Sequence, residues 1–314
     1  MSVVSWKGVY PAVLTPFLEN GAIDFSTFTL NIEAQLEAGV DGIILNGSLG
    51  EASTLESGER LELLSHTHRI VQGKVPVIMN VAEQSTKVAI EAARQAAGGG
   101  ADGLMLLPPM RYKSDDRETV AFFRSVAAST HLPIMIYNNP VDYKIMVTLD
   151  MFEAMEDMAN IQAVKESTRD VTNITRMVNR FGDRFKIMCG VDPLAMESLC
   201  LGADGWVAGL VDAFPRETVA VYRLVKGGQY KEALKIYRWF MPLLELDIHP
   251  KLVQYIKLAA SHTGLGTEYV RAPRLVLEGG ERKLVEDVIT AALANRPELP
   301  DYLNVPLVQE GLLT

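Results

Sequence analysis

The sequence has 314 residues, of which 48% are hydrophobic and 22% are charged, which is the composition of a folded globular protein and excludes a disordered chain. Its formal net charge is −9, its pI is about 5.2, and no stretch gathers lysines and arginines, so we expect no nucleic-acid partner. Two cysteines, no signal-peptide pattern and no apolar run of about 18 residues favour a cytoplasmic protein that binds no membrane.

Short apolar segments of strand length recur through the first two-thirds of the chain. The predicted strands are residues 9–14, 42–45, 76–81, 103–107, 134–137, 161–165, 185–189 and 205–208. Helical spacing of apolar residues follows each strand, near residues 25–38, 57–72, 85–98, 116–130, 149–158, 169–181, 192–201 and 216–226. Because the strands are apolar along their whole length, the pattern predicts a (β/α)8 TIM barrel, whose parallel strands are buried on both faces.

A short repeat, with the sequences AGVDG, GGADG and LGADG, lies between a predicted helix and the next strand at three places. We expect its glycines Gly39, Gly100 and Gly202 to end these helices in the left-handed conformation. After residue 226 the pattern predicts only helices, near residues 229–246, 250–262 and 281–295. We therefore divide the chain into a barrel (1–226), a C-terminal extension of three helices (227–296) and a tail (297–314), which is an arm or disordered.

Catalytic residues of such barrels lie at the C-terminal ends of the strands, and Lys165 ends the sixth predicted strand. Burial in an apolar strand disfavours the charged ammonium and lowers the pKa of a lysine, which leaves a free amine that can form a Schiff base with a carbonyl. The alternative is a lysine whose ammonium reaches water at the barrel mouth and has no catalytic role.

Tyr137 ends the fifth predicted strand and therefore lies beside the sixth. Its phenol is a candidate proton relay for a carbinolamine on Lys165. The alternative, which the position of Tyr137 taken alone favours, is an aromatic strand residue with only a packing role. The following Asn138, Asn139 and Pro140 are typical turn residues.

A glycine-containing loop, Asn46-Gly-Ser-Leu-Gly-Glu51, follows the second predicted strand. Gly47 permits close backbone approach, and the N–H groups of Ser48 and Leu49 are candidate ligands for a carboxylate. The alternative is a capped turn in which Ser48 or Ser57 begins a helix. The five histidines and two cysteines have no metal-binding spacing, so we predict no metal site.

Taken together, Gly47-Ser-x-Gly-Glu51, Tyr137-Asn-x-Pro140 and Lys165-Glu166 resemble the N-acetylneuraminate lyase and dihydrodipicolinate synthase superfamily of Schiff-base aldolases, over residues 7 to 295. The resemblance implies a pyruvate-like α-keto acid substrate, no cofactor other than the covalent imine on Lys165, and a homotetramer. It implies that Lys165 forms the imine, that Tyr137 relays protons and that the Ser48 hydroxyl positions Tyr137. The Ser48 and Leu49 backbone would bind the substrate carboxylate, and Val207 would line the pocket.

Departures from the family pattern bear on the substrate. Dihydrodipicolinate synthases carry a second hydroxyl where this chain has Leu49, and an arginine for the aldehyde substrate's carboxylate where this chain has Asp142. The tyrosine that a neighbouring subunit lends in that family is missing near Pro109 and Met110. An aspartate repels a carboxylate, so these departures disfavour dihydrodipicolinate synthesis.

The loop after residue 45, Tyr137-Asn-Asn-Pro140 and residues 205–215 are most similar to the branch that includes 1-pyrroline-4-hydroxy-2-carboxylate deaminases of hydroxyproline catabolism. In this hypothesis Asp142 contacts the substrate hydroxyl or ring nitrogen, and the products are 2,5-dioxopentanoate and ammonia. The alternatives are an aldolase for 2-keto-3-deoxy sugar acids, a pyruvate aldolase like N-acetylneuraminate lyase, and a relative that binds a ligand without turnover.

Overall fold

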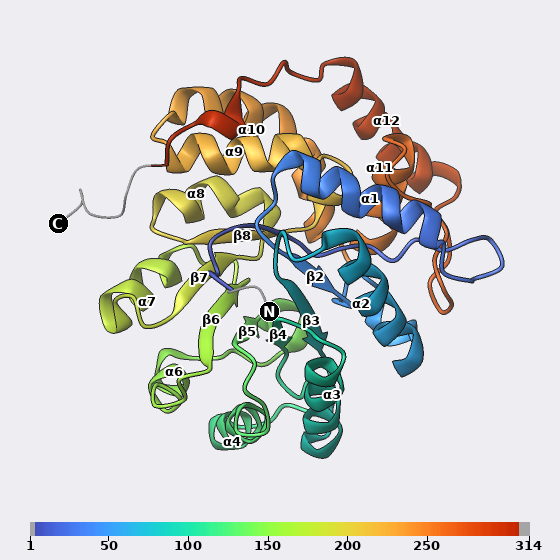
Figure 1. The fold of residues 1–314 in the computed structure, drawn as a ribbon. Helices are drawn as coiled ribbons and strands as arrows, with labels where there is room; N and C mark the ends of the chain where they lie inside the picture. The colour runs from blue at the N-terminus through green and yellow to red at the C-terminus, as the bar shows by residue number, and fades with distance from the viewer. Residues whose placement is uncertain (1–3, 308–314) are drawn as a thin grey trace.

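The computed structural model describes residues 4–307 and consists of a parallel eight-stranded barrel surrounded by helices (Figure 1). The strand order is β1-β8-β7-β6-β5-β4-β3-β2. A parallel bridge between Ala12 and Ile44 joins the two ends of this order and closes the barrel. The strands are β1 (Gly8–Pro11), β2 (Ile43–Leu45), β3 (Val77–Val81), β4 (Gly103–Leu106), β5 (Ile134–Asn138), β6 (Ile161–Glu166), β7 (Lys186–Cys189) and β8 (Gly205–Ala208).

Helices alternate with the strands around the barrel. The helices are α1 (Phe25–Ala38), α2 (Ser57–Val71), α3 (Thr86–Gly98), α4 (Asp116–Ala127), α5 (Pro140–Tyr143), α6 (Leu149–Glu153), α7 (Thr172–Phe181), α8 (Ala195–Cys200), α9 (Pro215–Lys226), α10 (Tyr230–Leu244), α11 (Leu252–His262) and α12 (Gly279–Ala294). Short 3-10 helices are η1 (Ala52–Thr54), η2 (Asp192–Leu194), η3 (Leu210–Asp212), η4 (Glu245–Ile248) and η5 (Tyr302–Asn304). The predicted TIM barrel is confirmed.

The strands are buried almost completely, as their continuous apolar sequences require. Seven of the eight predicted strands overlap the observed bounds to within two residues at each end, whereas the first ends earlier, at Pro11. Beyond the bridge at Ala12, the N–H of Leu14 donates to the carboxylate of Asp212 (3.0 Å) and not to a neighbouring strand. The backbone therefore leaves the sheet before the apolar run ends.

The predicted barrel helices that differ most from the structure are those near residues 149–158 and 192–201. Residues Asp192–Leu194 form the 3-10 helix η2, and α8 begins only at Ala195. Helix α6 ends at Glu153, and the following turns have the tighter i to i−3 pattern, as between the Met155 N–H and the Phe152 carbonyl.

The three repeated turns adopt the predicted conformation, with φ angles of 87° at Gly39, 91° at Gly100 and 107° at Gly202. After α9 the chain forms the predicted helical extension, in which α10 packs against α9 and α12 packs against α10 and α11 (Figure 1). In the tail, η5 packs against α9, and the prediction for residues 308–314 lies outside the described residues. Within residues 4–307, no helix is both long and apolar enough to cross a membrane.

Candidate active site

A pocket with an empty volume of about 670 Å³ opens at the C-terminal ends of the strands. Every site residue predicted from the sequence lines it: Gly47, Ser48, Leu49, Tyr137, Asp142, Lys165 and Val207. These residues come from the ends of β5, β6 and β8 and from the loops after β2 and β5. The structure therefore gathers the three separate sequence motifs around one cavity.

Lys165 and Tyr137 lie side by side on the neighbouring parallel strands β6 and β5, where they are direct partners in the strand pairing. The Lys165 Nζ atom lies 4.2 Å from the centroid of the Tyr137 ring, and both side chains are only 7% exposed. Burial lowers the pKa of Lys165, although the acidic groups of Asp247 and Asp192 oppose the shift. The lysine thus has the buried position and the lowered pKa that an amine nucleophile requires.

Space for this lysine depends on a glycine after β7. A Cβ atom at Gly190 would lie 2.6 Å from Lys165 Cγ and 2.1 Å from Ser167 Oγ, closer than side chains pack. The backbone N–H of Gly190 donates to the Glu166 carbonyl (2.9 Å), which holds this loop against β6. Gly190 therefore leaves the room in which the Lys165 side chain extends toward the pocket.

The Ser48 hydroxyl has a different partner from the one expected. It forms a short hydrogen bond with the hydroxyl of Tyr143, at the end of α5, whereas Tyr137 accepts a hydrogen bond from the Asn139 amide (3.2 Å). The expectation that Ser48 positions Tyr137 is therefore corrected: Ser48 pairs with Tyr143. The reason is local, because α5 turns the chain after Asn139 and carries Tyr143 back over the pocket, where its ring packs edge-on against Tyr137 at 5.4 Å.

The asparagines after Tyr137 have a larger role than ordinary turn residues. Asn139 caps α5 by accepting from the Asp142 N–H (3.2 Å), and its amide also donates to the Asp142 carboxylate (2.7 Å). Asn138 is fully buried and bonds both the N–H and the carbonyl of Val147 (2.9 and 3.1 Å). Asn138 and Asn139, at the end of β5, therefore hold the loop that carries Asp142 and Tyr143.

The loop after β2 leaves two backbone donors unused. Within residues 4–307, neither the Ser48 N–H nor the Leu49 N–H donates to another group of the protein, although both residues line the pocket. Helix α2 begins at Ser57, where Glu56 and Glu59 form a capping box, so Ser48 does not cap it. The free N–H groups keep the predicted carboxylate site available.

Five further pocket residues were not predicted from the sequence: Tyr143, Ser167, Arg169, Asp192 and Asp247. Four of them line the cavity directly, whereas Asp192 is fully buried and contacts the lining residue Asp247 through its N–H (3.4 Å). Ser167 and Arg169 follow β6, and Asp192 follows β7, so the rule that strand ends carry function pointed to their loops. Asp247 comes from η4 in the C-terminal extension, and no local sequence pattern identified it.

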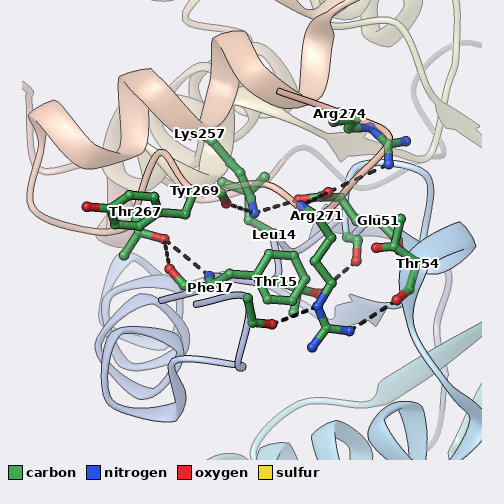
Figure 2. Close-up of polar contacts among 12 residues, drawn as sticks. Leu14, Thr15, Phe17, Glu51, Thr54, Lys257, Thr267, Tyr269, Arg271 and Arg274 are labelled. Carbon is green, nitrogen blue, oxygen red and sulfur yellow. Dashed lines mark hydrogen bonds and ion pairs between the residues drawn. The ribbon is translucent and has the colours of Figure 1, made fainter. Parts of the chain in front are cut away.

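The C-terminal extension also contacts the loops that follow β1 and β2 (Figure 2). Thr267 donates its hydroxyl proton to the Phe17 carbonyl (2.8 Å). The Arg271 guanidinium donates to the carbonyls of Gly21 (2.8 Å) and Thr54 (3.1 Å) and packs over the Phe17 ring. The segment after α11 therefore ties together the loops that follow β1 and β2.

A buried ion pair lies at the centre of these contacts. The side chains of Glu51 and Lys257 are both 0% exposed and approach to 2.5 Å. Lys257 also donates to the Tyr269 carbonyl (2.6 Å), while the Arg271 N–H (3.2 Å) and the Arg274 guanidinium (3.6 Å) contact the other Glu51 oxygen (Figure 2). Burial lowers the pKa of Lys257 to about 8, with Glu51 opposing the shift, so the lysine stays charged at neutral pH.

This pair acts on the predicted carboxylate site through the backbone. Glu51 has a φ angle of 57°, a left-handed conformation that a non-glycine residue adopts at some cost. Its N–H donates to the Ser48 carbonyl (3.2 Å). The ion pair therefore fixes a tight turn whose other end carries Ser48.

Comparisons with known proteins identify the family of this chain and similar folds. A family model described as the dihydrodipicolinate synthetase family matches residues 5–292. The chain is 33% identical over 288 residues to a 4-hydroxy-tetrahydrodipicolinate synthase from Exiguobacterium sibiricum, covering 90% of this chain and 96% of that protein. Among solved structures, the 4-hydroxy-tetrahydrodipicolinate synthase from Methylacidiphilum fumariolicum is similar with a TM-score of 0.86, 30% identity and coverage of 92% and 97%. A dihydrodipicolinate synthase from Bacillus anthracis is similar with a TM-score of 0.87, 28% identity and coverage of 92% and 99%.

Proposed function

This chain belongs to the dihydrodipicolinate synthetase family of Schiff-base lyases, and we propose that it dehydrates and deaminates 1-pyrroline-4-hydroxy-2-carboxylate to 2,5-dioxopentanoate and ammonia. The observation that carries the imine chemistry is the buried Lys165 with a lowered pKa, directly opposite Tyr137 in the ladder. Asp142 at the pocket supports the choice of substrate, because a carboxylate there accepts hydrogen bonds from a hydroxyl or a ring nitrogen and repels a second carboxylate.

The reaction begins at C2 of the cyclic imine. The neutral Lys165 amine adds to C2, the C2–N bond of the ring breaks, and the result is a ketimine between Lys165 and the open-chain substrate. The substrate carboxylate lies against the free N–H groups of Ser48 and Leu49, whose partial positive charges hold it locally although the protein as a whole is negatively charged. No metal or added cofactor takes part in this proposal.

One elimination, one rearrangement and two hydrolyses complete the cycle. The ketimine acidifies the C3–H bond, so loss of the C3 proton is followed by departure of the C4 hydroxyl as water. The resulting unsaturated amine rearranges to an imine at C5, which water hydrolyses to an aldehyde and ammonia. A second water hydrolyses the ketimine, which releases 2,5-dioxopentanoate and restores Lys165; in total one water is consumed.

Proton transfer to and from the carbinolamine is assigned to the two tyrosines. Burial raises the pKa of both Tyr137 and Tyr143, so both remain protonated donors at neutral pH. Tyr137 lies against the reacting nitrogen, and the hydroxyls of Tyr143 and Ser48 form a chain through which a proton moves along the loop. Ser48 and Tyr143 belong to the same polypeptide, so this pair of hydroxyls needs no residue from another subunit.

Tyr143→Phe is expected to slow imine formation roughly 10²-fold, because it removes one hydroxyl from the chain without changing the ring packing. The rate is measured by quenching with borohydride after increasing times with pyruvate and counting the modified Lys165 by mass spectrometry. Tyr230→Phe, at an exposed tyrosine at the start of α10, is the matched control. An unchanged rate in Tyr143→Phe would assign the proton transfers to Tyr137 alone.

A substrate panel tests the overall proposal. We expect ammonia and 2,5-dioxopentanoate from 1-pyrroline-4-hydroxy-2-carboxylate. If no ammonia is released but 2-keto-3-deoxy sugar acids or N-acetylneuraminate yield pyruvate, the deaminase assignment is wrong and the aldolase is correct.

A second candidate function is 4-hydroxy-tetrahydrodipicolinate synthesis, which the names of the similar proteins support. The exposed guanidinium of Arg169 at the rim of the pocket is the specific observation in its favour, since it offers a cation to a second carboxylate. Condensation of pyruvate with aspartate semialdehyde, added to the same panel, separates this activity from the other two.

A further inference from the structure

Asp247 is a pocket residue that the mechanism above does not use. It lies in η4, directly after α10, so it reaches the barrel mouth from the C-terminal extension and lines the same cavity as Lys165. A Cβ atom at Gly209 would lie only 2.6 Å from Asp247 Oδ1, which shows how closely η4 approaches the end of β8. Its Oδ2 atom faces the Asp192 N–H at 3.4 Å. The carboxyl group is thus fixed over the pocket by two loops of the barrel.

The residue that contacts Asp247 through its N–H, Asp192, carries a second buried carboxyl group. Asp192 is fully buried and accepts hydrogen bonds from the Trp206 indole (2.9 Å), the Gly209 N–H (3.2 Å) and the Leu210 N–H (2.7 Å). Three donors favour the ionised form of Asp192 and oppose the rise that burial causes in its pKa. Asp247 Oδ2 receives only the one long contact from the Asp192 N–H, and the buried charge of Asp192 disfavours a second charge beside it, so we place a proton on Asp247.

The other groups around Asp247 are consistent with this distribution of charge. Burial, followed by the charge of Asp192, raises the pKa of Asp247 to about 8, while Lys165 on β6 opposes the shift and Asp142 on α5 adds to it. Tyr137 on β5 also faces Asp247 and is neutral. A carboxylic acid, a lysine with a lowered pKa and protonated phenols therefore line the pocket.

We propose that Asp247 is a general acid of this pocket, which donates its proton to the group that leaves the substrate bound to Lys165. In the deaminase reaction, on which this assignment rests, the Asp247 proton passes to the C4 hydroxyl, the C4–O bond breaks and water departs. The proton abstracted from C3 is then passed through the pocket to the Asp247 carboxylate, which becomes neutral again. The C-terminal extension thereby supplies a catalytic residue as well as support for the loops.

The test uses Asp247→Asn, which keeps an oxygen to accept the Asp192 N–H but has no proton of comparable acidity. We expect kcat to fall roughly 10²-fold. In the wild type, kcat should fall as the pH rises above about 8, where Asp247 loses its proton, and this decrease should be lost in the variant. The borohydride adduct between pyruvate and Lys165 should form in both proteins. Glu245→Gln, at an exposed carboxylate of the same 3-10 helix, should match the wild type.

A measurement without turnover separates this proposal from the proposed function. At neutral pH the infrared difference spectrum between wild type and Asp247→Asn should contain the carbonyl stretch of a protonated carboxyl group. Absence of that band overturns the assignment whatever the substrate is, as does a variant that keeps the kcat and the pH profile of the wild type. Absence of ammonia release from the wild-type enzyme instead contradicts the deaminase function, and the infrared band then still decides the state of Asp247.

Discussion

Replacement of Lys165 by alanine is expected to reduce turnover by more than about 10⁴-fold, the scale of loss when a covalent nucleophile is removed from an enzyme. The reason is that Lys165 is the amine opposite Tyr137 at the end of β6, so the imine has no other place to form. The measurement is steady-state turnover of the active substrate from the panel, together with mass spectrometry of the protein after borohydride reduction with pyruvate. We expect no adduct in the variant.

The pH dependence follows from the same lysine. A lowered pKa means that the ammonium loses its proton at a lower pH than an exposed lysine does. Below that pKa the group is charged and cannot attack a carbon, so activity should rise with pH through the lowered pKa of Lys165. The rate of adduct formation with pyruvate, followed across pH, isolates this step from later proton transfers.

A matched control is Lys144→Ala, at an exposed lysine directly after Tyr143 whose ammonium donates to the Val141 carbonyl. It should keep both adduct and turnover. The fold of Lys165→Ala should be intact, because removing a buried amine also removes its cost of burial. A borohydride adduct that persists in Lys165→Ala would place the nucleophile on another lysine.

The barrel and the centre of the site were predictable because they depend on local patterns. Each strand is an apolar run short enough to be distinguished from a helix, and a parallel barrel places consecutive strands side by side. Lys165 and Tyr137 stand at the ends of neighbouring strands, so their proximity followed from counting strands. Their exact register, in which the two are direct partners, needed the structure.

The remaining site residues depend on how loops pack, which the spacing of apolar residues does not encode. Tyr143 reaches Ser48 only because α5 reverses the chain after Asn139. Asp247 enters the pocket because α10 gives way to η4 at the barrel mouth, and its sequence context predicts no more than the end of a helix. Asp142 lines the pocket, as predicted from its position after Tyr137, whereas its hydrogen bond with the Asn139 amide was not predicted.

Lys257→Met is expected to lower the free energy of unfolding by about 3–5 kcal/mol, because it leaves Glu51 charged, buried and without its lysine partner. Arg271 and Arg274 still contact Glu51, which places the expected loss toward the lower end of that range. The measurement is urea unfolding followed by circular dichroism. Lys283→Met, which breaks an exposed pair with Asp287 on α12, is the control and should change stability little.

The double variant Glu51→Gln with Lys257→Met distinguishes an unpaired charge from lost packing. If the uncompensated carboxylate causes the loss, the double variant should be more stable than Lys257→Met alone, since Gln carries no charge. Because Glu51 also holds the turn that carries Ser48, both single variants should raise KM for pyruvate in adduct formation by loosening the carboxylate site. If Lys257→Met and the double variant are equally stable, the loss comes from the packing of Lys257 and not from the unpaired charge of Glu51. If KM is unchanged, the ion pair has no effect on the carboxylate site.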